Sequence, residues 1–424
     1  MTIAQLSLQA FRKIIRYAGR LMTRPGGRFV SLDEGSLLAA ARRRAPDGEF
    51  DDMRFLEPLR QLLRSLERDA RLNFLGRVAA RADIIRLLTN RLLLAHDRRT
   101  HPEIAAGEIR QPLFITGLPR SGTTFLHGLL AQDPAHRVPL TWETMYPSPP
   151  NGAIRADEEH IQKAARQLAW LHRLAPDFQK IHPVGATLPE ECLIIMSHSF
   201  LSVQFSSMFF VPSYQTWLDQ QELCPAYEIH RQFLQQLQYR HSGARWVLKA
   251  PAHLAGLPAL FAVYPDARVI LTHRNPIEVV GSLASLHATL RGVFSDTVDA
   301  PRIGPEVSAA LAGEIERAMR ARAANVAPPE RFLDVWYTDL MRDPIGAVRQ
   351  IYAQFEFPLS SAAEARMRRY VVETPKDRHG RHEYTLERFG LSAETEHERY
   401  RTYCEHFGLN DAAGGKTVHM AGSS

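Results

Sequence analysis

The sequence predicts an α/β fold preceded by a helical region, and three features of its 424 residues support this prediction. Residues 114–116 form a short apolar run with a branched residue, which is typical of a buried strand. A glycine-bounded turn follows at 117–122, and residues 123–130 have the mixed apolar character of a helix packed on a sheet. Between residues 55 and 66, phenylalanine and leucine recur at helical spacing, which predicts helices ahead of the sheet.

The turn at 117–122 has the composition of a phosphate-binding loop. Backbone N–H groups in such a turn point inward, and the positive N-terminus of the following helix favours an anion. Glycine is needed because a side chain would block close approach of the backbone or forbid a positive φ. The loop departs from the Walker A pattern, because Thr123 occupies the position of the lysine that bridges the β and γ phosphates. The cation lies inside the loop instead, at Arg120.

A second stretch, residues 268–286, predicts another anion site. Residues 269–272 have the composition of a buried strand, and Pro276 suits the first turn of a helix, where its missing N–H is tolerated. Arg274 and Ser282 are eight residues apart, so one follows the strand and the other lies two turns into the helix. Both side chains can therefore reach one phosphate. The alternative is a surface ion pair of Arg274, which contributes little to stability.

The sequence PRSGTT after the first strand and the arginine, asparagine and serine at 274, 275 and 282 resemble the cofactor motifs of sulfotransferases that use PAPS (3′-phosphoadenosine-5′-phosphosulfate). The resemblance covers about residues 110–390. It implies a P-loop-type three-layer fold with a central parallel sheet and helices on both faces. It also implies that Arg274, Asn275 and Ser282 bind the 3′-phosphate, and that the first loop binds the 5′-phosphosulfate. The residues of that loop are Pro119, Arg120, Ser121, Gly122, Thr123 and Thr124.

Two weaker matches extend the predicted cofactor site. In VWYTDLMRDP, Tyr337 follows a strand-like run, and the resemblance implies a contact with the adenine. A core aromatic at a strand end is the alternative. Near residue 380 the resemblance implies a loop that closes over the 3′-phosphate, and a solvated basic turn is the alternative. The residues that match this loop are Arg378, His379 and Gly380.

Sulfuryl transfer to a hydroxyl or amine requires cations near the transferred oxygens, a base and fixed geometry. Arg120 is the first candidate cation. Lys249 is the second, because it follows the strand-like run 246–248, and ligands bind at the carboxyl ends of such strands. The transferred group carries less negative charge than a γ-phosphate, so protein cations can replace magnesium. We therefore expect PAPS as donor, PAP (3′,5′-adenosine bisphosphate) as product and no required metal.

Two residues compete for the role of base. Glu143, in PLTWETMY, lies where several bacterial and protein-tyrosine relatives have a glutamate base, and it is the preferred candidate. His253 lies four residues after Lys249 and has a suitable unperturbed pKa. The alternatives are a helix cap for Glu143 and a backbone contact for His253. Glu190 and Glu191 are interpreted mainly as caps at a helix start, where the dipole favours acidic residues, with a contact to the acceptor as the lesser alternative.

Composition narrows the class of partner. The net charge of +6 and the pI near 9.3 suit a polyanionic ligand. Nucleic acid is not expected, because the sequence lacks an aromatic–basic platform, zinc-ligand spacing and a helix-turn-helix pattern. The odd number of well-separated cysteines, at 192, 224 and 404, indicates reduced thiols. No signal peptide is recognised, and no apolar run reaches the roughly 18 residues of a membrane span, so a cytoplasmic location is expected.

We expect three regions along the chain. Residues 1–108 form a helical region, 109–410 the α/β sulfotransferase domain, and 411–424 a disordered Gly/Ser/Ala-rich tail. Residues 101–104 are expected to be the linker. Pro58 suits a first helical turn, so Phe55 is expected just before that helix. Residues 8–23 can form a basic amphipathic helix, either on a membrane surface or as a docking or dimer helix, and the oligomeric state is left open.

The acceptor region is expected between the two phosphate motifs, at 140–245, where aromatic residues gather. These residues suit an apolar pocket for a small-molecule, lipid or carbohydrate acceptor, although most aromatics of this kind are core residues. The aromatic residues are Trp142, Phe178, Phe200, Phe205, Phe209, Phe210, Tyr214 and Trp217.

Two other functions remain open: a P-loop kinase, and a non-catalytic protein that binds PAP or lipid at a membrane surface.

Overall fold

The computed structural model describes residues 30–149, 156–174, 184–241, 245–374 and 385–409. Several predictions fall outside the described residues: the basic helix at 8–23, the tail from 411, the aromatic Phe178, and the loop residues Arg378, His379 and Gly380.

Five parallel strands form the central sheet of the described chain, in the order β2-β3-β1-β4-β5. β1 lies between β3 and β4, with Leu113 opposite Val247 and Gly117 opposite Thr272. The predicted α/β fold with a central parallel sheet is therefore confirmed. The strands are β1 Leu113–Gly117, β2 His136–Arg137, β3 Arg245–Lys249, β4 Arg268–His273 and β5 Phe332–Trp336.

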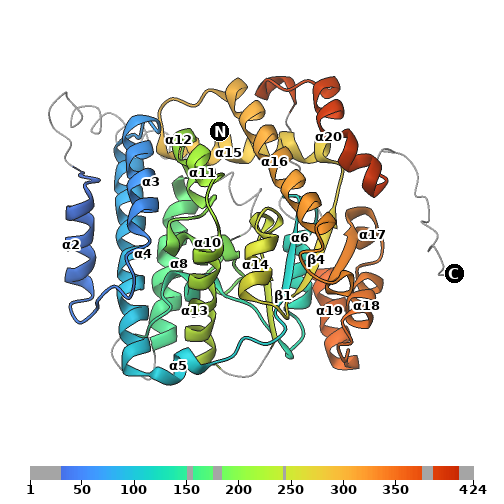
Figure 1. Ribbon diagram of the computed structural model, residues 1–424, viewed down its shortest axis with the longest axis horizontal. Coiled ribbons are helices and arrows are strands. Elements are labelled where there is room, and N and C mark those ends of the chain that lie inside the picture. Colours follow the sequence, from blue (N-terminus) through green and yellow to red (C-terminus); the bar gives the residue numbers. More distant parts are fainter. Residues whose placement is uncertain (1–29, 150–155, 175–183, 242–244, 375–384, 410–424) are drawn as a thin grey trace, which may run out of the picture.

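Alternate residues of each strand enter two separate apolar clusters, because successive side chains point to opposite faces of a sheet. In β1, Leu113 and Ile115 pack on one face while Phe114 packs on the other. Helices therefore cover both faces and make three layers (Figure 1). One face carries α6 Thr123–Leu130, α18 Pro344–Gln354 and α19 Ser361–Glu373, and the other carries α13 Cys224–Arg240, α14 Leu257–Val263 and α16 Ala300–Ala323.

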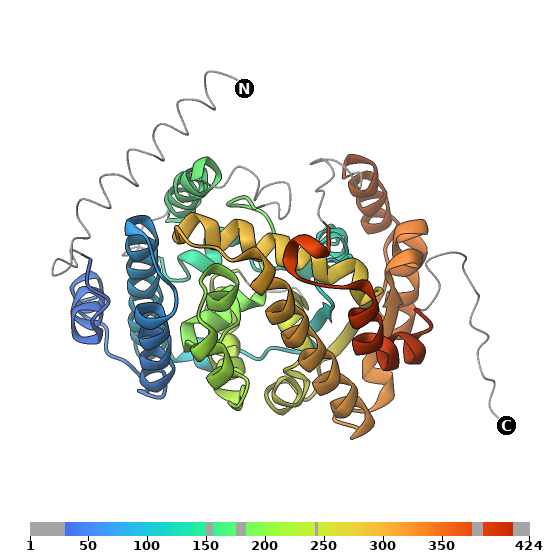
Figure 2. The same ribbon diagram turned by 90° about the horizontal axis from the view of Figure 1, so that it is seen from above.

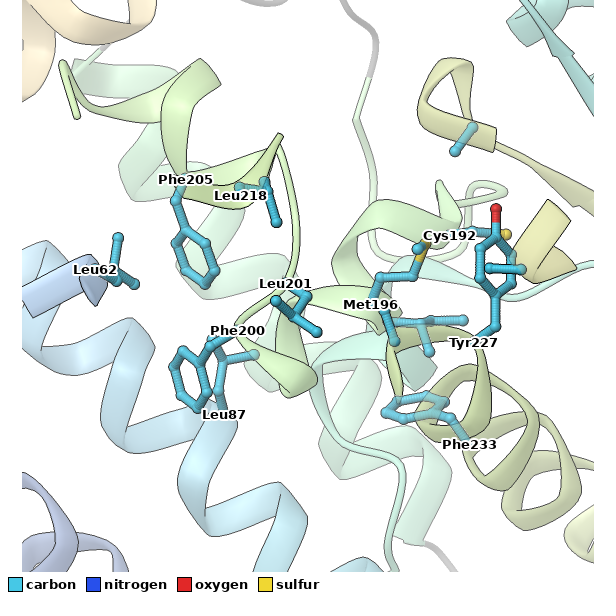
Figure 3. Packing of buried hydrophobic residues seen from close by; sticks show 14 of the residues in the cluster. Leu62, Leu87, Cys192, Met196, Phe200, Leu201, Phe205, Leu218, Tyr227 and Phe233 are labelled. Atoms are coloured by element: carbon cyan, nitrogen blue, oxygen red, sulfur yellow. The ribbon is translucent and has the colours of Figure 1, made fainter. Parts of the chain in front are cut away.

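The N-terminal helices are α2 Glu34–Arg44, α3 Leu56–Arg68 and α4 Phe74–Thr100, and α3 begins directly after Phe55 as expected. Their apolar side chains share one cluster with residues far along the chain: Figure 3 shows Leu62 and Leu87 packed beside Phe200 and Phe205. The apolar core is therefore continuous across position 108. Within the segment expected to be the linker, 101–104, Pro102 starts a short helix, α5 Pro102–Ala106.

The segment between β2 and β3 carries the aromatic residues predicted to form an acceptor pocket. Phe200, Phe205 and Tyr214 are fully buried and belong to the main core, so they stabilise the fold rather than line an open pocket. The elements here are α7 Thr141–Met145, α8 Ala156–Leu174, α10 Cys192–Met196, η1 Ser197–Ser199, α11 Gln204–Met208 and α12 Pro212–Leu218.

The remaining elements connect the strands or follow β5. They are η2 Pro251–Leu254, α15 Pro276–Phe294, η3 Pro329–Arg331, α17 Tyr337–Arg342, η4 Glu387–Phe389 and α20 Ala393–Phe407. No helix in the described ranges combines the length and the apolar character needed to cross a membrane.

The shared core makes a prediction about stability. Leu87→Ala should lower the free energy of unfolding by about 2–5 kcal/mol, because it removes a fully buried side chain and leaves a cavity. Val78→Ala on the same helix, at a residue that is 38% exposed, should change it by less than about 0.5 kcal/mol. Urea denaturation measures both. Equal, small losses would mean that α4 does not contribute to the cooperative core.

Candidate active site

The loop after β1 has the strand–turn–helix geometry that the sequence predicted. Gly117 has φ +134°, and a Cβ there would lie 2.3 Å from the Thr272 carbonyl oxygen of β4. Gly122 has φ +88° and precedes α6, and a Cβ there would lie 3.3 Å from the Tyr337 ring. Both glycines are therefore required, the first by close approach of two strands and both by a positive φ.

A buried hydroxyl pair fixes this loop to β4. Ser121 Oγ and Thr272 Oγ1 lie 2.5 Å apart, and one of the two hydroxyls donates to the other. The carbonyl oxygens of Leu118, within hydrogen-bond distance of Ser121, and Thr116, within that of Thr272, can accept the remaining hydroxyl proton. Ser121 is fully buried, so its hydroxyl shapes the loop from beneath. Arg120, with φ +65°, and Thr124 are exposed on the outer side of the loop.

The predicted second anion site lies against the first. Arg274 follows β4, and its Nη1 donates to the Arg120 carbonyl oxygen at 2.8 Å. Its guanidinium carbon lies 4.3 Å from the centroid of the Tyr337 ring, and its Nε donates to Glu278 at 3.0 Å. The structure therefore brings together Arg120, Arg274 and Tyr337, which are far apart in the sequence.

The helix after Arg274 begins at Pro276 as predicted. The Asn275 side chain caps α15 by accepting a hydrogen bond from the Ile277 N–H at 3.0 Å, and it donates to the Leu409 carbonyl oxygen at 3.2 Å. Ser282 lies two turns into this helix and is largely buried. Both the oxygen and the nitrogen of the Asn275 side-chain amide are therefore hydrogen-bonded, which fixes the start of α15 next to Arg274.

Lys249 ends β3 and connects the phosphate-type loop to α10. Its side chain is only 2% exposed, and its Nζ donates to Thr124 Oγ1 at 3.2 Å. The same Nζ forms an ion pair with Glu191 Oε1. A buried cation, a loop hydroxyl and a carboxylate therefore meet at the carboxyl edge of the sheet.

Glu190 and Glu191 precede α10, as the interpretation of the sequence expected. Glu191 makes no side-chain cap and faces Lys249 instead. Glu190 is buried, and its carboxylate accepts a hydrogen bond from the Glu191 N–H at 2.9 Å. Burial raises the pKa of Glu190; the hydrogen bond from the Glu191 N–H opposes this rise, and the charge of Glu191 adds to it. The two neighbouring carboxyl groups are therefore chemically different.

Glu143 has the contacts of a helix cap, the structural role that the sequence offered as the alternative to a base. Its Oε1 accepts from Arg137 Nη2 at 2.6 Å, its Oε2 accepts from the Leu140 N–H at 2.9 Å, and the residue is 3% exposed. Burial lowers the pKa of Arg137, while the Glu143 charge opposes this shift. This engaged, buried carboxylate favours the alternative role of Glu143 as a cap and ion-pair partner.

His253 has the surroundings of a core histidine. It is fully buried in η2, its Nδ1 lies 2.8 Å from the Tyr227 hydroxyl, and its ring packs edge-on against Phe114. Burial holds the pKa of His253 well below its usual value, and His230 and Lys249 add to this effect. Its Nε2 is buried and has no hydrogen-bond partner among the described residues. The contact of its Nδ1 is with a side chain, and not with the backbone as the structural alternative expected.

The analysis of the sequence undervalued Glu191 and missed Thr272. Glu191 carried one usable signal, a pair of adjacent acidic residues, but nothing local identified its partner Lys249, 58 residues later. Thr272 belongs to a strand-like run and gave no signal of a contact with Ser121, 151 residues away.

Proteins of known family resemble most of this chain. A family model described as the sulfotransferase family matches residues 112–361, which contain every strand of the described chain and both motifs that the sequence predicted to bind anions. The omega-hydroxy-beta-dihydromenaquinone-9 sulfotransferase Stf3 of Mycobacterium bovis and that of Mycobacterium tuberculosis are each 25% identical over 291 residues, which cover 65% of this chain and 70% of theirs.

Two solved structures are similar over most of their length. Sulfotransferase STF1 from Mycobacterium tuberculosis H37Rv has a TM-score of 0.77 and 33% identity, and the match covers 88% of this chain and 99% of that one. Sulfotransferase STF9 from Mycobacterium avium has a TM-score of 0.77 and 28% identity, covering 90% and 98%. With its strand order, its glycine loop and these relatives, the chain belongs to the sulfotransferase family.

Proposed function

We propose that the chain transfers a sulfuryl group from PAPS to a hydroxyl or amine of a partly apolar small-molecule, lipid or carbohydrate acceptor. The contacts from Thr124 through Lys249 to Glu191 carry this proposal. They join a phosphate-type loop, a buried cation and a carboxylate, which are the groups that transfer to a hydroxyl requires. Membership in the sulfotransferase family supports the reaction class.

The residues present fit PAPS, which carries two separated anionic groups. Gly117 and Thr272 lie opposite each other on neighbouring strands, so the loop after β1 and Arg274 after β4 form adjacent anion sites. A Cβ at Gly117 or Gly122 would crowd Thr272 or Tyr337, so these glycines allow the close-packed turn whose backbone N–H groups would bind the 5′-phosphosulfate. When bound, PAPS would supply the sulfuryl group.

The same residues divide between the two ends of this cofactor. The loop residues Pro119, Arg120, Gly122, Thr123 and Thr124 would hold the 5′-phosphosulfate, with Ser121 holding the loop in shape. Arg274 and Ser282 would hold the 3′-phosphate, with Arg378, His379 and Gly380 as further predicted contacts. Tyr337 would contact the adenine, because its ring lies beside both the loop residue Gly122 and the Arg274 guanidinium.

Glu191 is the base in this proposal, in place of Glu143 and His253. It would accept the proton from the acceptor hydroxyl, so that the acceptor oxygen becomes the nucleophile and the proton ends on the Glu191 carboxylate. Lys249 holds a positive charge between Glu191 and Thr124 and would stabilise negative charge that develops at the loop. Arg120 is the second cation, on the exposed side of the loop.

The acceptor class is inferred from the surroundings of Glu191 and from the relatives. Leu188, three residues earlier, is 43% exposed, so an apolar side chain faces solvent near the proposed base. The two Stf3 relatives are named for a hydroxylated dihydromenaquinone. We therefore propose a hydroxyl group on an apolar molecule as the first acceptor to test.

The donor prediction is tested by thermal unfolding. PAP without added metal should raise the melting temperature, with a stabilisation of about 2.7 kcal/mol at a hundredfold excess over Kd. If PAP leaves the melting temperature unchanged while ATP with magnesium raises it, the kinase alternative is favoured. PAP binding with no turnover of PAPS for any acceptor would favour a non-catalytic binding protein.

The 3′-phosphate prediction needs two variants, because Arg274 also contacts the loop. Arg274→Ala should weaken the binding of PAP by about 1.5–3 kcal/mol, since a charged hydrogen bond is lost. The binding of adenosine 5′-phosphosulfate, which has no 3′-phosphate, should weaken less. Ser282→Ala is the matched control, because Ser282 lies in α15 away from the loop, and it should weaken PAP alone. Calorimetric titration that shows equal losses for both ligands with both variants would contradict the assignment.

The base prediction contrasts two glutamates. Glu191→Gln should lower kcat by roughly 10²–10⁴, with PAP affinity near wild type, because the amide cannot take a proton at neutral pH. Glu143→Gln should retain kcat but lose about 1.5–3 kcal/mol of stability, because it weakens a charged hydrogen bond to the buried Arg137. PAP release from PAPS with a panel of hydroxylated acceptors, together with urea denaturation, separates them. The reverse pattern would return the base to Glu143.

A further inference from the structure

One face of α8 combines positive charge with an exposed aromatic ring. Lys163, Arg166, Trp170 and Arg173 follow one another at intervals of three, four and three residues, so they lie on one side of the helix. All four are exposed to solvent. The opposite side of the helix is buried against the protein through His160, Ala164 and Leu168.

Trp170 is 54% exposed, which is unusual for so large an apolar side chain. The Arg173 guanidinium carbon lies 5.6 Å from the centroid of its ring, and Lys163 Nζ lies 4.2 Å from the centroid of the Tyr146 ring. The face therefore alternates cations with aromatic rings. Such side chains suit a boundary between water and an apolar phase, where the ring is partly solvated and the charged group remains hydrated.

Positive charge accumulates here without acidic partners. Arg44, at the end of α2, adds a further positive charge. Burial is the larger cause that lowers the pKa of Lys163, and the charges of Arg44 and Arg166 lower this pKa further. Within the ranges that the structure describes, Lys163, Arg166, Arg173 and Arg44 form no ion pair with a carboxylate. Glu158 and Glu159 lie in the first turn of α8, so the positive face, which we define as Lys163, Arg166, Trp170 and Arg173 of α8 together with Arg44 of α2, begins beyond that turn.

The position of α8 leaves this face open to a large flat partner. Figure 2 shows α8 at the periphery of the molecule, beyond α4 and α15, rather than between layers. Its first half is held by α7 and α13, through the ring contact of Trp142 with His160 and the ion pair of Asp157 with Arg240. The second half reaches past these contacts toward solvent.

We propose that this positive face binds the headgroup layer of an anionic bilayer. Each basic residue near an anionic lipid surface contributes about 1 kcal/mol, and tryptophan prefers the depth of the headgroups. Charge complementarity selects lipid surfaces that carry net negative charge. This inference stands independently of the proposed reaction, although an enzyme held at a bilayer would have direct access to an apolar, hydroxylated acceptor.

Co-sedimentation of the full chain with large vesicles tests the proposal. Wild type should bind vesicles made of equal parts phosphatidylcholine and phosphatidylglycerol, and only weakly bind phosphatidylcholine alone. Lys163→Gln with Arg166→Gln should lower the partition coefficient on the mixed vesicles by about 30-fold, because two basic residues are lost. Raising the salt concentration should weaken wild-type binding, because ions screen exposed charges.

The matched control removes the same charge elsewhere. Arg366 and Arg369 are exposed on α19, which lies far from α8 in Figures 1 and 2. Arg366→Gln with Arg369→Gln should lower the partition coefficient by less than about threefold, since distant charges are screened. PAP binding should be unchanged in both double variants, which shows that each is folded. Equal loss in both, or no loss in the α8 variant, would overturn the proposal; the second result would direct attention to other basic segments.

Tryptophan emission provides a second readout at the ring itself. Binding to mixed vesicles should shift the wild-type emission to shorter wavelength, because Trp170 leaves water. Trp170→Phe should keep most of the sedimentation but lose most of the shift. A full shift in Trp170→Phe would mean that another tryptophan enters the bilayer, and the proposed face would be wrong.

Discussion

The close approach of β1 and β4 at Gly117 is the constraint on which the rest of the site depends. With no side chain at Gly117, the Thr272 carbonyl can lie where a Cβ would stand. Thr272 then reaches Ser121 from beneath the loop, and Arg274, two residues later, reaches the Arg120 carbonyl from the side. Two anion sites that are separate in the sequence become one surface because two adjacent parallel strands end together.

Lys249 adds the cation that this surface would otherwise lack beneath it. A lysine that is 2% exposed requires a partner, because an isolated buried charge is costly. Glu191 supplies the opposite charge, and Thr124 supplies a hydroxyl from the loop. The need to satisfy one buried ammonium group therefore places a carboxylate beside a phosphate-type loop. Glu143 has a comparable role elsewhere in the fold, because it forms an ion pair with the partly buried Arg137.

The surface of the protein is organised by the same core. α3 and α4 share an apolar cluster with the segment that follows α8, so the N-terminal helices form a wall rather than a separate module. α8 is anchored by its first half to α7 and α13. Its second half presents cations and Trp170 outward, at some distance from Lys249 along the chain. The proposed catalytic residues and the proposed membrane contact thus lie on different elements of one folded core.

The sequence by itself determined what depends on neighbours in the chain. Strand runs, glycine positions, Pro276 as a helix start and the spacing of Arg274 from Ser282 all follow from local backbone geometry, and the family resemblance rested on them. The tertiary structure decided what depends on burial and on distant partners. It assigned Glu143 to Arg137, enclosed His253 beside Phe114 and Tyr227, and set Glu191 against Lys249. The proton-accepting ability of a carboxylate or imidazole depends on exposure and neighbouring charge, and residues many positions apart determine both only after the chain has folded.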